Sequence, residues 1–181
     1  MSNQFRNIDT NPNTLNGFVY GSWREVIPKA LRKPMIAYAL NYCVNNYKLV
    51  ILGYLITDHR LVLVLNNTEH EKREIFKHLY ASINYQIEQY LKEQEKRERI
   101  LVNDLMLSLR NNEPPLKEYI VLNYELKALL TGHEIGMKFY NPTFEQLKNR
   151  LRNNPFCSVI SYNGGEGPVI MTYLNLKHAK E

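Results

Sequence analysis

The sequence predicts an α+β fold, and three observations lead to that class. Two nearly continuous runs of Val, Leu and Ile, at Leu49–Ile56 and Leu61–Leu65, have the length and composition of strands in the middle of a sheet. A strongly periodic amphipathic helix is expected after them, over roughly residues 69–96. A further strand and a further helix are expected before them. The order strand, helix, strand, strand and helix mixes both element types within one unit.

The bulk composition favours one main soluble domain. The chain has 181 residues, of which 44% are hydrophobic, enough for one sizeable core. No run approaches the roughly 18 uncharged apolar residues that a membrane span needs, and the polar start does not resemble a signal peptide. We therefore expect a cytoplasmic protein with no membrane partner. The two cysteines, Cys43 and Cys157, have neither disulfide-framework nor zinc-site spacing and should be buried.

The net charge of +5 is concentrated in the first third of the chain, because residues 1–68 hold seven Lys/Arg against three Asp/Glu. A chain of pI about 9.1 with such a cluster suits a polyanionic partner, although a solvated surface is the alternative. The candidate nucleic-acid-binding residues are Arg24, Lys29, Arg32, Lys33 and Arg60.

Local signals define the first elements. Residues 1–14 are rich in Asn and Thr and are expected to form a flexible arm. Leu15–Trp23 alternates apolar positions and is expected to be a strand. Pro34 suits the first turn of a helix that ends near Asn45-Asn46. The apolar face with which this helix is expected to pack on the sheet consists of Ile36, Leu40, Cys43 and Val44.

A short polar segment, Thr57-Asp58-His59-Arg60, separates the two central strands. Asn67 or Thr68 can cap the helix that follows, and Glu69 and Glu71 suit the positive end of its dipole. The apolar face of this helix is expected to contain Phe76, Leu79, Tyr80, Ile83, Ile87 and Leu91.

A soft boundary near residue 97 separates a domain at 15–97 from a C-terminal extension at 98–181 that packs on it. SVISY and PVIMTYL, joined by the loop NGGEG, are expected to form a terminal β-hairpin. Helices are expected in the extension over residues 101–109, 116–130 and 143–152.

One arrangement in this order of elements could carry chemistry. In a strand, His59 and Leu61 point to the same face. Tyr80 and Asn84 are at i and i+4, so they share a face of the following helix. If that helix packs back on the sheet, both can stand over His59. A tyrosine, an amide and an imidazole that converge would suit a tyrosine nucleophile beside a metal.

Four stretches of the chain together resemble the single-tyrosine HUH transposases, notably the REP-associated ones. The family's order is a strand, a helix, a strand that runs into a histidine-hydrophobic-histidine motif, and a helix with Y-x-x-x-N. The resemblance covers roughly residues 15–91, and Arg152-Asn153-Asn154-Pro155 is similar to an Asn-Asn-Pro segment near the family's C-terminal end. The four stretches are GFVYGSW, a Pro-started helix ending in LNYC, KLVILGYLITDHRLVLVL, and Tyr80-Ala-Ser-Ile-Asn84.

The resemblance implies a ferredoxin-like (RRM-like) fold, in which helices pack on one face of an antiparallel sheet. It also implies nicking of single-stranded DNA beside hairpins and strand transfer through a 5′-phosphotyrosine. Tyr80 would be the nucleophile, and His59 and Asn84 would hold a divalent metal, Mg²⁺ or Mn²⁺. The family's second histidine falls on Leu61, which supplies no ligand, so a protein without a metal is an open alternative.

Each of these residues also has a purely structural interpretation. His59 could be a strand-end histidine bonded to backbone, Tyr80 a core residue whose hydroxyl reaches a partner, and Asn84 a surface amide. The thirteen tyrosines could stack on unpaired bases, or they could serve as strand and core residues.

Three functions therefore compete. The first is a transposase-like protein that binds single-stranded or hairpin DNA through its basic first third and nicks it. The second, which Leu61 favours, is a decayed or domesticated homologue that binds nucleic acid without cleavage. The third is a protein-binding module that has kept only the fold. The oligomeric state is open, a homodimer included.

Overall fold

A computed structural model describes residues 14–98, 113–136 and 139–173 of the chain. Most of the predicted N-terminal arm and the predicted helix at 101–109 lie outside these residues. In chain order the elements are β1 (Thr14–Tyr20), the 3-10 helix η1 (Ser22–Glu25), α1 (Lys29–Tyr47), β2 (Ile51–Ile56), β3 (Arg60–Leu65), α2 (Glu69–Glu98), β4 (Leu116–Leu122), α4 (Tyr124–Leu130), α5 (Pro142–Arg152) and α6 (Val159–Tyr162).

The centre of the molecule is a four-stranded sheet in the order β2-β3-β1-β4, with every neighbouring pair antiparallel. The predicted α+β class is confirmed. On β1, Phe18 lies between Leu61 of β3 and Glu118 of β4, which fixes the register of the three strands. Because β4 follows α2, a boundary at residue 97 would leave this sheet without one of its strands.

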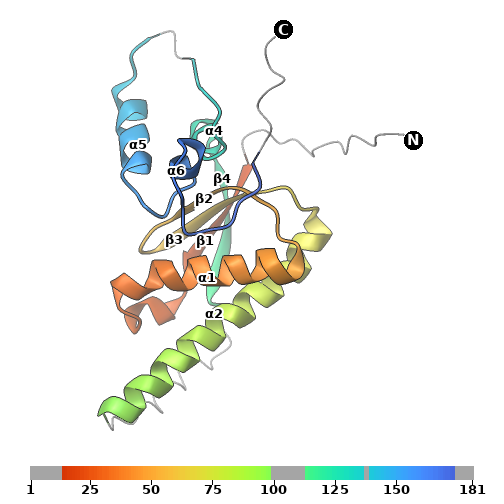
Figure 1. Ribbon diagram of the computed structural model, residues 1–181, viewed down its shortest axis with the longest axis vertical. Helices are drawn as coiled ribbons and strands as arrows, with labels where there is room; N and C mark the ends of the chain where they lie inside the picture. Colours follow the sequence, from red (N-terminus) through yellow and green to blue (C-terminus); the bar gives the residue numbers. More distant parts are fainter. Residues whose placement is uncertain (1–13, 99–112, 137–138, 174–181) are drawn as a thin grey trace, which may run out of the picture.

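Helices α1 and α2 cover one face of the sheet (Figure 1). Helix α2 closely matches its prediction, and its buried residues follow the predicted stripe. Helix α1 begins earlier than predicted, because Pro28 caps it in an extended conformation and Pro34 lies inside it. The buried residues that α1 and α2 contribute are Arg32, Ile36, Ala37, Ala39, Leu40, Cys43, Ile75, Phe76, Leu79, Ile83, Ile87 and Leu91.

The start of α2 is held by a reciprocal cap. The Thr68 backbone N–H donates to the Glu71 carboxylate over 2.8 Å, and the Glu71 N–H donates to the Thr68 hydroxyl over 3.3 Å. This capping box satisfies two backbone donors that a helix start leaves free. Asn67, the other predicted cap, instead accepts a hydrogen bond from the Val50 N–H over 2.8 Å.

The opposite face of the sheet is covered by α4, α5 and α6 (Figure 1), so the prediction of helices on one face describes only half of the sheet. The helix predicted at 143–152 is confirmed as α5. The helix predicted at 116–130 is wrong in its first half, which is β4. The buried residues of this second layer and of the strands beneath it are Leu15, Leu52, Val62, Val64, Leu130, Leu151, Cys157 and Val159.

The predicted terminal hairpin is wrong, because SVISY contains the helical turn α6 and the described part of PVIMTYL has no strand. Ser158 explains the difference. Its buried hydroxyl donates to the Leu130 carbonyl over 2.7 Å and accepts from the Tyr54 N–H over 3.0 Å, so it joins α4 to β2. Gly53 permits this close approach, since a side chain there would collide with the backbone of Leu130.

Candidate nucleic-acid interface

The polar segment Thr57-Asp58-His59-Arg60 forms the tight turn between β2 and β3. The Thr57 N–H donates to the Arg60 carbonyl over 2.9 Å, and the Arg60 N–H donates to the Thr57 hydroxyl over 3.0 Å. His59 therefore lies in a turn, with its side chain exposed, and its carbonyl accepts the Tyr20 N–H over 3.0 Å. Arg60 is exposed beside it. Two side chains able to meet an anion thus project from one end of the sheet.

The start of α1 packs against this turn and brings the predicted basic cluster to it. Arg32 is buried, and its guanidinium donates to the Ile27 carbonyl over 2.8 Å and to the Asp58 carbonyl over 3.5 Å. Lys33 forms an ion pair with the Asp58 carboxylate over 3.2 Å. Arg32 therefore has a structural role, which the sequence did not reveal, and Asp58 offsets part of the charge of Lys33.

Two further predicted cations complete this end of the molecule. Lys29 is exposed in the first turn of α1. Arg24 is partly exposed in η1, and its guanidinium donates to the Tyr20 carbonyl over 3.3 Å. Lys29 and Arg60 are thus the most accessible cations of the predicted set.

The Asn-Asn-Pro segment also reaches this end of the sheet. The Asn154 amide donates to the Ile56 carbonyl over 3.2 Å, immediately before the turn. The Ile56 N–H donates to the Phe156 carbonyl over 2.9 Å, and the Lys33 ammonium lies 5.8 Å from the centre of the Phe156 ring. The segment therefore covers the edge of β2 and holds the β2–β3 turn in place.

Tyr80, the predicted nucleophile, lies on α2 with its hydroxyl directed at β4. The hydroxyl donates to the Glu118 carboxylate over 2.8 Å, and the ring stacks on Phe76. Partial burial, together with the hydrogen bond and charge of Glu118, raises the pKa of Tyr80 well above the usual value for tyrosine. This environment keeps the proton on the phenol.

The predicted nucleophile and the two predicted metal ligands lie in different parts of the structure. His59 is exposed in the β2–β3 turn, Asn84 is exposed on α2, and Tyr80 contacts β4, which β1 separates from β3. Leu61, at the position of the missing histidine, is fully buried in the core between the sheet and α1 and α2. Within the described residues, no group of three or more His, Cys, Asp and Glu side chains could hold a metal ion.

The tyrosines divide between the two roles that composition left open, core packing and an exposed ring surface. Tyr20 and Tyr54 are buried core residues, whereas Tyr38 and Tyr85 are each 61% exposed and line a hollow between α1 and α2. Ring surface is therefore available on the helical face as well as in the core.

Glu118 is the contact that sequence reasoning missed, because it lies on a strand that was predicted as helix.

In the part of the chain that the structure describes, no helix is long and apolar enough to cross a membrane. No family model, curated protein or solved structure matches the chain.

Proposed function

We propose that this chain binds single-stranded or hairpin DNA at the β2–β3 turn and the start of α1, and that it does not cleave the DNA. In this proposal the chain is a decayed relative of the single-tyrosine HUH transposases with a ferredoxin-like fold. The strand order β2-β3-β1-β4, with α1 and α2 as the crossing helices, supports that fold.

The observation that carries the proposal is the convergence of cations from separate parts of the chain on one end of the sheet. Lys29 and Lys33 come from α1, Arg60 from the β2–β3 turn and Arg24 from η1. Cations on such a surface contact phosphates and release counterions from the nucleic acid, which gives salt-dependent affinity. His59 can add a hydrogen bond to the same surface.

The absence of cleavage is inferred from Tyr80 and Leu61. A tyrosine nucleophile must lose its proton and contact a phosphodiester. Burial and the Glu118 carboxylate raise the pKa of Tyr80, and the carboxylate also repels a phosphate. Leu61 is apolar and buried at the position where a second metal ligand would be needed. The fold also does not bring His59 and Asn84 together, since His59 lies in the β2–β3 turn and Asn84 is exposed on α2. This donor set does not fit Mg²⁺ or Mn²⁺, so the proposal assigns no metal.

One observation favours a second candidate, DNA nicking by Tyr80. The 2.8 Å distance from its hydroxyl to Glu118 is within the range for a general base and its nucleophile. Glu118 would then take the phenol proton as the phenol oxygen bonds to phosphorus, while the P–O3′ bond breaks and the leaving 3′ oxygen takes a proton from water. The raised pKa of Tyr80 opposes this function, which is why it stands second.

The binding proposal is tested by the salt dependence of affinity for a fluorescent oligonucleotide, with and without a hairpin. The Lys29→Ala/Arg60→Ala protein should bind single-stranded DNA more weakly. The slope of log K against log salt should become shallower by about 1.4, because two phosphate contacts are lost. Lys92→Ala/Lys96→Ala removes the same charge from exposed positions on α2 and is the matched control. Equal losses in both double variants, or no binding at low salt, would refute an interface at the turn.

A separate assay distinguishes the two candidates. The wild-type protein is incubated with hairpin-flanked single-stranded DNA and either Mg²⁺ or Mn²⁺, and covalent protein–DNA product is sought on a denaturing gel. We expect none. A covalent product that disappears in Tyr80→Phe would replace the binding function by the nicking function.

A further inference from the structure

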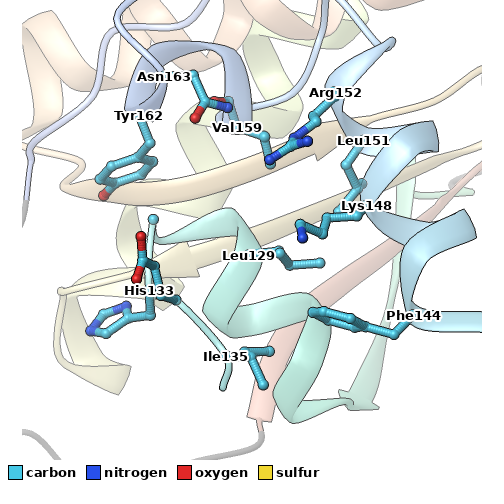
Figure 2. A pocket seen from close by; sticks show the side chains of 12 residues that line it. Leu129, His133, Ile135, Phe144, Lys148, Leu151, Arg152, Val159, Tyr162 and Asn163 are labelled. Atoms are coloured by element: carbon cyan, nitrogen blue, oxygen red, sulfur yellow. The ribbon is translucent and has the colours of Figure 1, made fainter. Parts of the chain in front are cut away.

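The layer of α4, α5 and α6 lies on the face of the sheet opposite α1 and α2 (Figure 1). A second hollow lies in this layer (Figure 2). It has a volume of about 380 Å³ and is open to solvent on one side. That size is at the lower end of the range for small-molecule sites, which is roughly 300–1,000 Å³. The hollow lies on the other face of the sheet from α1, although the segment that follows Arg152 reaches the β2–β3 turn.

The floor of this hollow is apolar. Leu151 and Val159 are buried beneath it, Leu129 is half-buried beside them, and the buried Phe144 ring forms one side (Figure 2). These side chains come from three different helices, so the floor exists only in the folded layer. A ligand with an apolar body would bury its surface here, at about 25 cal/mol per Å².

Two cations lie on the α5 side of the hollow. Lys148 and Arg152 are four residues apart, so both project from the same face of α5, and Figure 2 shows their charged ends directed toward the space above Leu129 and Val159. The Lys148 ammonium is positioned by the Phe144 ring, whose centre is 5.7 Å away. An ammonium and a guanidinium side by side can share one anionic group.

Three other polar side chains that line the hollow are engaged within the protein, and a fourth lining residue, Glu134, is an exposed carboxylate. The Tyr162 hydroxyl donates to the Leu52 carbonyl over 2.7 Å, the Asn163 amide donates to the Val159 carbonyl over 2.9 Å, and His133 shares a 2.8 Å hydrogen bond with Thr131. These bonds fix the wall opposite α5. Recognition of an anionic group therefore falls to Lys148 and Arg152, the only Lys and Arg side chains among the described residues that line the hollow, and it must outweigh the charge of Glu134.

The hydrogen bond that Lys148 makes is weak by comparison. It is a 3.3 Å contact with Glu145, one turn earlier on α5, and both side chains are partly exposed. Such pairs contribute little to stability. A ligand anion can therefore displace Glu145 at small cost.

We propose that this hollow binds a small anionic molecule that joins a carboxylate or a phosphate monoester to a flat apolar body. The anionic group contacts Lys148 and Arg152, and the apolar body rests on Leu129 and Val159. This site is independent of the DNA interface, and its existence does not depend on whether the chain binds DNA.

The test uses three probes with one ring system: 1-naphthoate, 1-naphthyl phosphate and the neutral 1-naphthalenemethanol. Binding is followed through the methyl NMR signals of Leu129 and Val159, in full-length protein. The anionic probes should bind at least fivefold more tightly than the neutral one. The tighter of the two anions identifies the ligand class as carboxylate or phosphate.

Matched variants locate the charge. Arg152→Gln and Lys148→Gln should each weaken binding of the better anion at least threefold, and Glu145→Gln should strengthen it because Lys148 is released. Arg150→Gln is the control, since Arg150 lies on the same helix but does not line the hollow. All these positions are at least partly exposed, so the folded state should survive each change.

Three results would overturn the proposal. One is equal affinity for the neutral probe, which would leave only an apolar hollow. Another is the same loss in Arg150→Gln as in Arg152→Gln. The third is displacement of the probe by a single-stranded oligonucleotide, which would mean that the two cations meet DNA phosphates instead of a small molecule.

Discussion

The Tyr80 hydroxyl donates a 2.8 Å hydrogen bond to the Glu118 carboxylate, and this bond joins α2 to the edge strand β4. Both residues are on the face of the sheet that α1 and α2 cover, since Glu118 lies opposite Phe18 and Phe18 packs against Phe76 of α2. The contact therefore ties the last strand of the sheet to the helical layer and places a negative charge beside the phenol.

Replacement of Glu118 by Gln should lower the pKa of Tyr80 toward the usual value for tyrosine. The change removes the negative charge and the anionic acceptor, while burial, the largest cause of the raised pKa, remains. The measurement is alkaline titration of tyrosinate absorbance, with the Tyr80→Phe curve subtracted to isolate Tyr80. Glu88→Gln, exposed on the same helix, is the control. Identical titration of Tyr80 in the Glu118→Gln and wild-type proteins would show that the carboxylate does not act on it.

Replacement of Asp58 by Asn should tighten the binding of single-stranded DNA. Asp58 holds Lys33 in a 3.2 Å ion pair, so its neutralisation frees one cation at the proposed interface. The salt slope of log K should steepen by about 0.7, the value for one added contact with a single strand. Fluorescence anisotropy over a salt series measures both quantities.

The control for Asp58→Asn is Glu74→Gln, which releases Lys77 from a comparable 2.8 Å pair on α2. It makes the same change in net charge at a site away from the turn. If both variants tighten binding equally, the effect is one of total charge and Lys33 has no special role.

Replacement of Leu61 by His should not create a metal site. Leu61 is fully buried among apolar side chains, so an imidazole there loses hydrophobic burial and lacks polar partners, at a cost of about 3 kcal/mol in free energy of unfolding. Leu63→His places the same side chain at another fully buried position of β3. Urea unfolding with and without Mn²⁺ compares the two. Stabilisation of Leu61→His alone by Mn²⁺ would instead identify Leu61 as the lost half of a metal-binding pair.

The elements that sequence reasoning predicted well are those whose signals are local. The period of α2 and its Thr68–Glu71 cap lie within one segment, and the runs at Ile51–Ile56 and Leu61–Leu65 are apolar because both faces of these strands are covered. In each case neighbouring residues carry all the information that the structure uses.

The elements that it missed depend on distant partners. Ile120 and Leu122 on β4 are 73% and 70% exposed, so the apolar pattern of this edge strand does not mark a buried face and is equally compatible with a helix. The turn at α6 is held through Ser158, whose partners Leu130 and Tyr54 are 28 and 104 residues away.

The candidate site shows the same limit. The cluster of cations was visible in the sequence, but the burial of Arg32 and the pairing of Lys33 with Asp58 follow from the packing of α1 against the β2–β3 turn. The Tyr80–Glu118 contact spans 38 residues and requires the correct assignment of β4. Residue types were thus predictable, whereas which of them remain free to bind was not.

The stability of the protein should fall as the pH rises above about 9, in part through Cys157. Burial raises the pKa of this thiol from 9.0 to about 11. A group whose pKa is higher in the folded state stabilises fully below its unfolded pKa and loses that contribution as the pH rises through the folded pKa. Between pH 9 and 11 the wild-type protein should therefore lose about 2 kcal/mol through Cys157, because the slope approaches its limit of about 1.4 kcal/mol per pH unit only midway between the two pKa values.

Cys157→Ala removes the titrating thiol, so its free energy of unfolding should decline less steeply than that of the wild type between pH 9 and 11. Urea unfolding at three or four pH values gives the slopes. Val159→Ala is the control, because it truncates a buried neighbour in the same layer without removing a titrating group and should shift the curve down at every pH with its slope unchanged. Parallel curves for Cys157→Ala and Val159→Ala would mean that the Cys157 thiolate forms as easily in the folded protein as in the unfolded chain, and that burial in the α4–α6 layer does not protect it.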